Sequence, residues 1–281
     1  MNGEKKTEEL EMRLARAASG ASAFLESITT ESMPVVKISR MPDTENVSSA
    51  NYGILVEEDR KHDGLRINYG LLADVDCSVD ADDDHDLEFI LPFVFLGIIR
   101  IRYGGAIERF FNAQKDGIGK IEADLTVRSY SKLLAATYIA RNAEEDGEEA
   151  LEGGENDCME TTLKNYVSYD LAVVDSFFAG FAKRFDIKNE MKRMSKAAER
   201  SAGRSTSSYI SYCYDRLAGE ALRSGFANGD FGSGIAPDER LVRAAQSYHS
   251  FISSMLAFYI FMSNKGKTGD KIKEFCGSLA T

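Results

Sequence analysis

The scarcity of proline is the sequence feature that says most about how this chain can fold. The sequence has four prolines among 281 residues. Proline breaks helix interiors, so its scarcity leaves room for long helices. Apolar residues make up 43% of the chain and aromatic residues 10%, which is ordinary for a globular protein and far from the composition of disordered chains. The length suits one large domain or two small ones.

Apolar residues recur at helical spacing in six segments, which predicts a helix in each. In the first, Leu10, Leu14 and Ala17 share one face. Pro237 suits the first turn of the last helix. The predicted helices cover residues 4–28, 126–142, 162–184, 186–202, 205–224 and 238–265.

Four stretches in the N-terminal half favour strands instead. Residues 35–39, 52–57 and 65–72 are short β-type runs separated by polar turns. Residues 89–103 are rich in β-branched and aromatic side chains, close with Gly104 and Gly105, and could pair with residues 118–125. The predicted fold is therefore mainly α with a minor β portion in the N-terminal half: a helical body with extended N-terminal and C-terminal segments.

Changes in composition predict four regions. Residues 1–50 form an N-terminal arm, and residues 51–125 form a mixed α/β region with an acidic loop at 74–86. Residues 126–235 form a helical core that carries an acidic insert at 143–160, and residues 236–281 form a C-terminal helix and tail. Positions 144–160 hold nine acidic residues and no basic ones, so the insert repels itself and is expected to be a loop.

Several function classes find no support in the sequence. The charged N-terminus is not expected to be a signal peptide, and the most apolar stretches fall short of the ~20 residues of a membrane span. The four cysteines form no close-spaced pair, so no zinc site is expected. No cofactor is expected either, because no cofactor motif stands out. His62, His85 and His249 stand apart from nucleophile motifs. We therefore expect a cytoplasmic protein that binds a partner and is not an enzyme.

Charge divides the chain into two parts. The net charge is −11, which by itself argues against a nucleic-acid partner. Residues 1–160 hold 17 basic and 33 acidic residues, whereas residues 161–281 hold 17 basic and 12 acidic residues. The overall negative charge therefore hides a basic element in the second part.

That basic element lies at residues 184–204. Six cations recur at every fourth position with two more beside them, and an apolar stripe can dock the other side of the helix on a core. A solvated helix face and a polyanion-binding ridge are both compatible with this row. A polyanion would relieve the repulsion between like charges at i, i+4. The cations are Arg184, Lys188, Lys192, Lys196, Arg200 and Arg204, with Lys183 and Arg193, and the stripe is Ile187, Met191, Met194 and Ala198.

Three tyrosines follow the row, Tyr209, Tyr212 and Tyr214. They could stack bases of single-stranded RNA, or they could belong to the core.

Three segments in order resemble coat proteins of flexible filamentous plant viruses, the potyvirus and potexvirus type. Residues 125–130 (LTVRSY) resemble a T-L-R segment, residues 169–178 (YDLAVVDSFF) an A-F-D-F-(Y/F) motif, and residues 191–198 (MKRMSKAA) a Q-M-K-A-A-A run. The chain departs from the family at Val174 and Ser176, which flank the motif Asp.

The resemblance implies a helical protein that packages RNA, in the host cytoplasm and the virion. It implies that Arg128 and Asp175 lie together in the groove that holds the RNA backbone. Such an arrangement is physically sensible, because a carboxylate can fix the guanidinium plane while the remaining N–H groups face a phosphate.

We therefore expect a coat or nucleocapsid-like protein that binds single-stranded RNA through phosphates, without sequence specificity. The N-terminal arm and the C-terminal helix would join neighbouring subunits into oligomers or filaments. The alternative is an acidic helical adaptor or matrix-like protein, whose basic row meets a protein or an anionic membrane surface.

Overall fold

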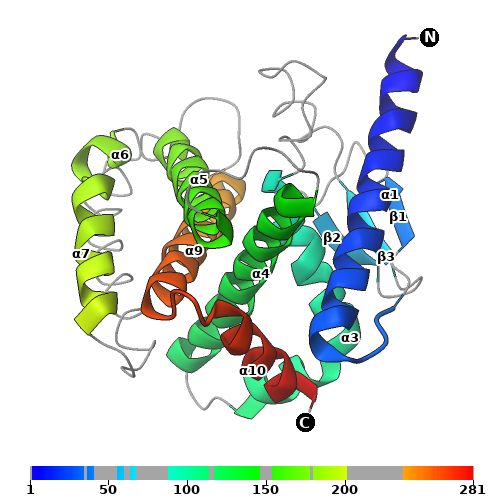
Figure 1. The fold of residues 1–281 in the computed structure, drawn as a ribbon. Coiled ribbons are helices and arrows are strands. Elements are labelled where there is room, and N and C mark those ends of the chain that lie inside the picture. Colours follow the sequence, from blue (N-terminus) through cyan, green and yellow to red (C-terminus); the bar gives the residue numbers. More distant parts are fainter. Residues whose placement is uncertain are drawn as a thin grey trace.

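The structure is a computed structural model that describes residues 2–34, 37–40, 56–59, 64–67, 88–113, 117–145, 154–177, 180–200 and 237–280. Helices dominate this part of the chain (Figure 1). The elements are α1 (Asn2–Thr29), β1 (Lys37–Arg40), β2 (Val56–Asp59), β3 (Gly64–Ile67), α3 (Leu91–Ala113), α4 (Gly117–Glu145), α5 (Gly154–Phe177), α6 (Phe181–Arg184), α7 (Ile187–Arg200), α9 (Pro237–Ser263) and α10 (Thr268–Ala280).

Helices α4 and α9 form the centre of the core. Helix α4 crosses the middle of the molecule and packs on α3, α5 and α9 (Figure 1). Residues 131–137 of α4 and residues 251–261 of α9 are all buried. A helix that is buried on every side needs apolar or small residues all around its axis, and both stretches meet that need apart from a few polar side chains.

Helix α1 covers one edge of this core. Leu14, Ala21 and Leu25 are fully buried, and they recur at helical spacing. The Phe24 ring meets the edges of Phe95 in α3 and Tyr138 in α4, with centroids 6.0 and 5.5 Å away. The amphipathic pattern of α1 therefore docks it on α3 and α4.

Helix α10 crosses the lower end of the molecule in Figure 1. Its Phe275 ring stacks on Tyr130 of α4, with centroids 4.1 Å apart.

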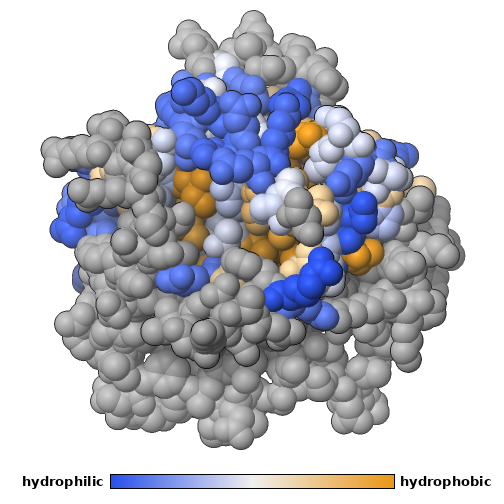
Figure 2. All heavy atoms as spheres, turned by 90° about the horizontal axis from the view of Figure 1, so that it is seen from below, coloured by the Kyte–Doolittle hydropathy of each residue, from blue (hydrophilic) through white to orange (hydrophobic). Residues whose placement is uncertain are grey.

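On the face seen from below, hydrophobic side chains reach the surface between hydrophilic ones (Figure 2). Among the described side chains, the large apolar one that stands exposed is Met12, at 56%.

The β structure of the described residues is a three-stranded sheet in the order β1-β3-β2. Strand β3 pairs parallel with β1 and antiparallel with β2, and each strand has four residues. The three strands overlap the ends of the short β-type runs at residues 35–39, 52–57 and 65–72.

The predicted fold class is wrong in its β portion. Residues 91–113 and 117–145 are helices α3 and α4, so the strand pair expected at residues 89–103 and 118–125 does not form. In α3, Val94, Phe95, Ile98 and Ile99 are completely buried. A segment that is apolar on all sides shows no 3.6-residue period, so its sequence does not distinguish a buried helix from a buried strand. Helix α3 kinks at Tyr103 (φ −114°, ψ 15°), just before the glycine pair that had indicated a strand end.

Two further expectations are corrected. Helix α5 begins at Gly154 and α4 continues to Glu145, so much of the expected acidic loop is helical. Neither terminal segment is an extension, because α1 packs on α3 and α4, α9 lies in the core, and α10 packs on α1, α3 and α4. The predicted region boundary at residue 125 falls inside α4, and the division into regions otherwise stays a prediction.

Most of the other described helices agree with their patterns. Residues 4–28 lie in α1, residues 126–142 in α4 and residues 187–200 in α7, and α9 begins at Pro237 as predicted. The single helix expected at residues 162–184 is divided instead, because α5 ends at Phe177 and α6 begins only after Gly180, whose φ is +76°. The acidic loop at 74–86 and the helix expected at 205–224 lie outside the described residues.

Candidate functional site

The basic face of α7 is the best-defined candidate site. Lys188, Lys192 and Lys196 are exposed, while Met194 and Ala198 on the opposite side are buried to 1% and 2% exposure. The buried side packs on α9, and α7 lies at the outer edge of the molecule (Figure 1). The apolar stripe thus fixes which side of α7 faces the core and turns the lysine row toward solvent.

The lysines of this face have no acidic partner in the described part of the chain. Among the described residues, no carboxylate lies within ion-pair distance of Lys188, Lys192 or Lys196. Arg193 differs, because its Nη1 lies 3.4 Å from Oε2 of the buried Glu190. We refer to Lys188, Lys192 and Lys196 together as the lysine row.

Helix α6 links the lysine row to α5. The Asp175 carboxylate, near the end of α5, accepts a hydrogen bond from the backbone N–H of Ala182 at 2.8 Å. Gly180 precedes α6 with φ +76°, a backbone conformation that glycine adopts without strain. Phe181 and Phe185 stack with centroids 5.4 Å apart, and Phe251 of α9 meets both rings edge-on. Asp175 therefore helps position α6, where Lys183 is exposed.

Arg128 is bound to a different carboxylate from the expected one. Its Nε donates to Oδ2 of Asp124 at 2.6 Å, one helical turn earlier in α4. The structure therefore does not join Arg128 to Asp175 as the coat-protein resemblance implies: Arg128 forms its ion pair with Asp124, and Asp175 accepts its hydrogen bond from Ala182. The contact of Arg128 and Asp175 with RNA stays a prediction. Asp124 fulfils the role expected of Asp175, since it fixes the plane of the Arg128 guanidinium.

Asp124 joins three helices. Besides Arg128, its carboxylate accepts hydrogen bonds from Arg100 of α3 at 3.0 Å and from Nε2 of His249 of α9 at 2.6 Å. Burial alone would raise the pKa of Asp124, but the hydrogen bond from His249 and the positive charge of Arg128 outweigh burial and hold the pKa well below its usual range. His249 is therefore a partner of a structural carboxylate that links α3, α4 and α9.

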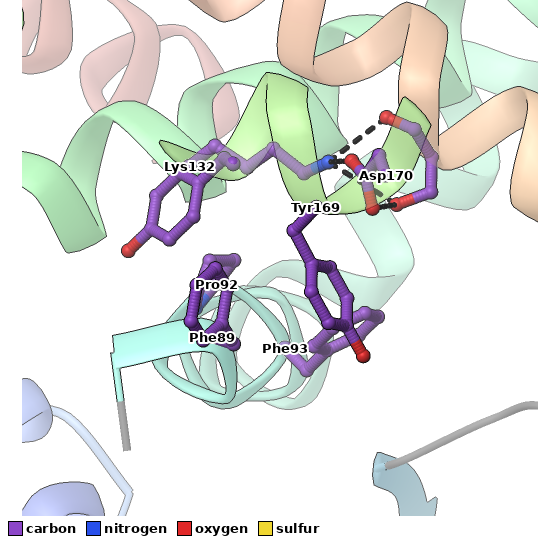
Figure 3. Close-up of a pocket in the computed structure, with 8 residues that line it drawn as sticks. Phe89, Pro92, Phe93, Lys132, Tyr169 and Asp170 are labelled. Carbon is purple, nitrogen blue, oxygen red and sulfur yellow. Dashed lines mark hydrogen bonds and ion pairs between the residues drawn. The ribbon is translucent and has the colours of Figure 1, made fainter. Parts of the chain in front are cut away.

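A second polar cluster lies two turns further along α4, between α4, α5 and α9 (Figure 3). Nζ of Lys132 donates to Oδ2 of Asp170 at 2.6 Å, to Oγ of Ser254 at 2.5 Å and to the carbonyl of Ser250 at 2.9 Å. The hydroxyls of Ser250 and Ser254 in turn donate to the two oxygens of Asp170. Burial lowers the pKa of Lys132, and the Asp170 carboxylate opposes that shift.

A small hollow lies beside this cluster, with aromatic walls and Lys132, Asp170 and Ser250 at its polar side (Figure 3). The walls are Phe89, Pro92, Phe93, Tyr166 and Tyr169. The ammonium protons of Lys132 and both oxygens of Asp170 are already occupied within the cluster. The arrangement is that of a satisfied buried ion pair that fixes three helices together.

Arg128 was predicted as a site residue and His249 was noted only as an isolated histidine, whereas Asp124, Lys132 and Asp170 were not predicted. Asp124, Arg128 and Lys132 follow one another at four-residue spacing on α4, so they lie along one side of that helix. Charged residues at helical spacing inside an otherwise apolar stretch were the available signal. The partners on α5 and α9 are 38 and 118 residues away from Lys132, and no local pattern connects them.

For three of the predicted site residues, the structure describes the backbone alone or nothing. The backbones of Arg184 and Arg200 belong to α6 and α7, but their side chains lie outside the described part. Arg204 lies outside it entirely, as do Tyr209, Tyr212 and Tyr214.

Comparison with known proteins adds no relative. No family model matches the chain, no curated protein matches it, and no solved structure matches its fold. Within the described residues, no helix is long and apolar enough to cross a membrane, and no group of His, Cys, Asp and Glu is arranged to hold a metal ion.

Proposed function

We propose that this protein binds single-stranded RNA through the exposed face of α7, as a structural nucleoprotein of coat or nucleocapsid type. One observation carries the proposal. Lys188, Lys192 and Lys196 stand exposed in one row, while the other side of the same helix is buried on α9. The helix thus presents positive charge from a fixed support in a chain that is otherwise acidic.

Repulsion along the lysine row favours a polyanionic partner. Like charges at i, i+4 destabilise a helix by a few tenths of a kcal/mol for each pair. Phosphates that bind the row remove this repulsion and release counterions, which is the main source of sequence-independent affinity. Lysine contacts to phosphate carry no sequence information. The resemblance of residues 125–130, 169–178 and 191–198 to viral coat proteins favours RNA among the possible polyanions.

Assembly of subunits through the N-terminal arm and the C-terminal helix belongs to the same proposal. The apolar residues of α1 and α9, among them Leu14, Leu25 and Phe258, lie in the core of the chain itself. Neighbouring subunits would therefore join through the polar outer faces of these elements, and one RNA strand bound along α7 of several subunits would hold them close together. Light scattering with and without RNA tests this part.

Fluorescence anisotropy with a labelled single-stranded RNA tests the RNA contact. The ridge variant K188Q/K192Q/K196Q removes three exposed charges from α7. The matched control R109Q/K267Q/K273Q removes three exposed charges from α3, α10 and the turn before α10. Circular dichroism checks that both variants keep their helix content.

We expect wild-type binding to weaken steeply with salt, with a slope of about −0.7 for each phosphate contacted. The ridge variant should lose most of the affinity, and the control should keep it. Absence of binding at low salt, or equal losses in both variants, would refute the proposal.

An acidic adaptor or matrix-like protein would use the same face of α7 against a protein or an anionic lipid surface. The apolar side of α7 is buried on α9, so contact with a membrane would be electrostatic alone. Flotation with phosphatidylserine vesicles, compared with RNA binding at the same salt concentration, separates the two functions.

A further inference from the structure

Three half-buried aromatic side chains lie together at the hollow beside Lys132. Phe89 precedes α3, Phe93 lies in the first turn of α3, and Tyr169 lies on α5. The centroids of the Phe89 and Tyr169 rings are 4.7 Å apart, and the rings are tilted by 30°. Lys132 and Asp170 lie at one side of the hollow and these three rings at the other (Figure 3). We refer to Phe89, Phe93 and Tyr169 together as the aromatic platform.

The aromatic platform is held in place by contacts between α5 and the residues just before α3. The hydroxyl of Tyr166, almost one turn before Tyr169 on α5, donates a hydrogen bond to the carbonyl of Glu88 at 2.9 Å. The Tyr166 ring meets the Phe89 ring edge-on, with centroids 6.2 Å apart. Rings that are already fixed can bind a ligand without the entropic cost of ordering them first.

The depth of the hollow limits what can bind there. Its enclosed volume is about 10 Å³, which holds about one water molecule. A larger ligand must therefore lie across the rings, and a flat group that stacks on them fits this shape. The polar atoms of Lys132, Asp170 and Ser250 are engaged with one another, so recognition rests on the ring faces.

Helix α5 positions both the aromatic platform and the lysine row. Tyr169 stands six residues before Asp175, about 9 Å along the helix axis. Asp175 accepts a hydrogen bond from Ala182 in α6, and α7 begins soon afterwards at Ile187. A strand of about 12 nucleotides spans about 40 Å along its axis even when stacked, which exceeds α7 and this part of α5 taken together. One strand is therefore long enough to contact both places.

We propose that the aromatic platform stacks a base of the RNA strand whose phosphates bind the lysine row. This inference rests on the proposed function and adds a site for a base to the site for phosphates. Every base has a π-face, so stacking on these rings increases affinity without selecting a sequence. The base also covers half-buried rings that otherwise face water, which favours binding through the hydrophobic effect.

Photo-crosslinking tests the contact in the unmodified protein. Ultraviolet light joins the uracil ring of 5-iodouridine to an aromatic ring that lies against it. With an oligo-uridine of about 12 nucleotides that contains 5-iodouridine, we expect a crosslink on Phe89, Phe93 or Tyr169. Peptide mass mapping locates the crosslinked residue. Crosslinks confined to other residues would overturn the inference.

A strand without bases separates stacking from phosphate binding. Fluorescence anisotropy compares oligo-deoxythymidine with an abasic deoxyribose-phosphate strand of the same length. Tyr169→Leu removes a ring but keeps an apolar side chain, so it should weaken oligo-deoxythymidine binding about tenfold, the effect of one stacked base. Binding of the abasic strand should not change. Tyr169→Phe keeps the ring and should restore the affinity, and circular dichroism checks the helix content of both variants.

The outcomes separate this inference from the function on which it rests. If Tyr169→Leu bound oligo-deoxythymidine as tightly as the wild-type protein does, or weakened both strands equally, base stacking at the aromatic platform would be overturned. RNA binding at α7 would still be upheld if K188Q/K192Q/K196Q weakened both strands. Failure of both strands to bind the wild-type protein would overturn the proposed function itself.

Discussion

Nζ of Lys132 lies 2.6 Å from Oδ2 of Asp170, and the two residues are 6% and 8% exposed. Removal of one member of a buried ion pair leaves the other charge without compensation. Lys132→Met should therefore lower the free energy of unfolding by about 3–5 kcal/mol. Urea denaturation followed by circular dichroism measures this change.

A surface pair of similar geometry is the control for that experiment. Lys271 and Glu274 of α10 lie 2.6 Å apart, but their side chains are 41% and 69% exposed. Lys271→Met should change stability by less than about 1 kcal/mol. Similar effects of the two substitutions would contradict the view that burial of the Lys132 pair makes it important.

Asp124 should make the fold sensitive to acid. The hydrogen bond from His249 and the charge of Arg128 hold the pKa of Asp124 below its usual value of 3.8, against the opposing effect of burial. A carboxyl whose pKa is lowered by folding stabilises the protein above the pKa of the unfolded chain, and this contribution is lost as the pH falls below about 4. Asp124→Asn should lower stability at neutral pH and flatten its decline below about pH 4. Urea titrations across that range check this, and parallel curves for the two proteins would count against it.

Cys276 should be an unreactive thiol. Burial, with a further contribution from the charge of Glu31, raises its pKa from 9.0 to about 12. Because the thiolate is the reactive form, iodoacetamide should label Cys276 slowly in the folded protein and rapidly in urea. The half-buried Cys158 provides an internal comparison in peptide mass mapping. Because the unfolded chain loses the Cys276 proton at a lower pH than the folded protein does, the free energy of unfolding should fall as the pH rises from about 9 toward 12. Fast labelling of Cys276 in the native state would show that it is not buried as described.

Gly20 marks the closest approach of α1 to α4. A Cβ at this position would overlap the hydroxyl of Tyr138. Gly20→Ala should therefore destabilise the protein by about 1–3 kcal/mol, although alanine normally favours a helix. Thermal unfolding measures the effect, and Tyr138→Phe in the same chain should recover part of it.

Gly277 provides the opposite case on α10. A Cβ there meets no atom within 4 Å, so Gly277→Ala should stabilise the helix by about 0.5–1 kcal/mol. If both glycine substitutions stabilised the protein, the close packing of α1 on Tyr138 would be disproved.

The sequence predicted the helices that bury one side, and it also predicted α9 and most of α4, which are buried on every side along part of their length. The stripes in α1 and α7 survive in the fold because Leu14, Leu25, Met194 and Ala198 face the core while charged residues face water. Helix α3 was not predicted, because its residues are apolar on all sides and so show no 3.6-residue period of apolar side chains.

The candidate site was also predictable from the sequence only in part. The lysine row of α7 is visible from spacing alone, because all its members lie on one helix. The partners of Arg128 and Lys132 depend on how α3, α4, α5 and α9 come together. Asp124, His249 and Asp170 therefore acquire their roles only from tertiary structure.

The central position of α9 has a consequence for how the chain is made. Helices α4, α5 and α7 all pack on α9, which begins at Pro237 and is therefore synthesised after them. Until α9 has been made, the sides of these three helices that pack on α9 in the folded protein have no partner. The fold therefore cannot be completed before α9 has been synthesised, and a protein cut short before Pro237 should expose its core and aggregate.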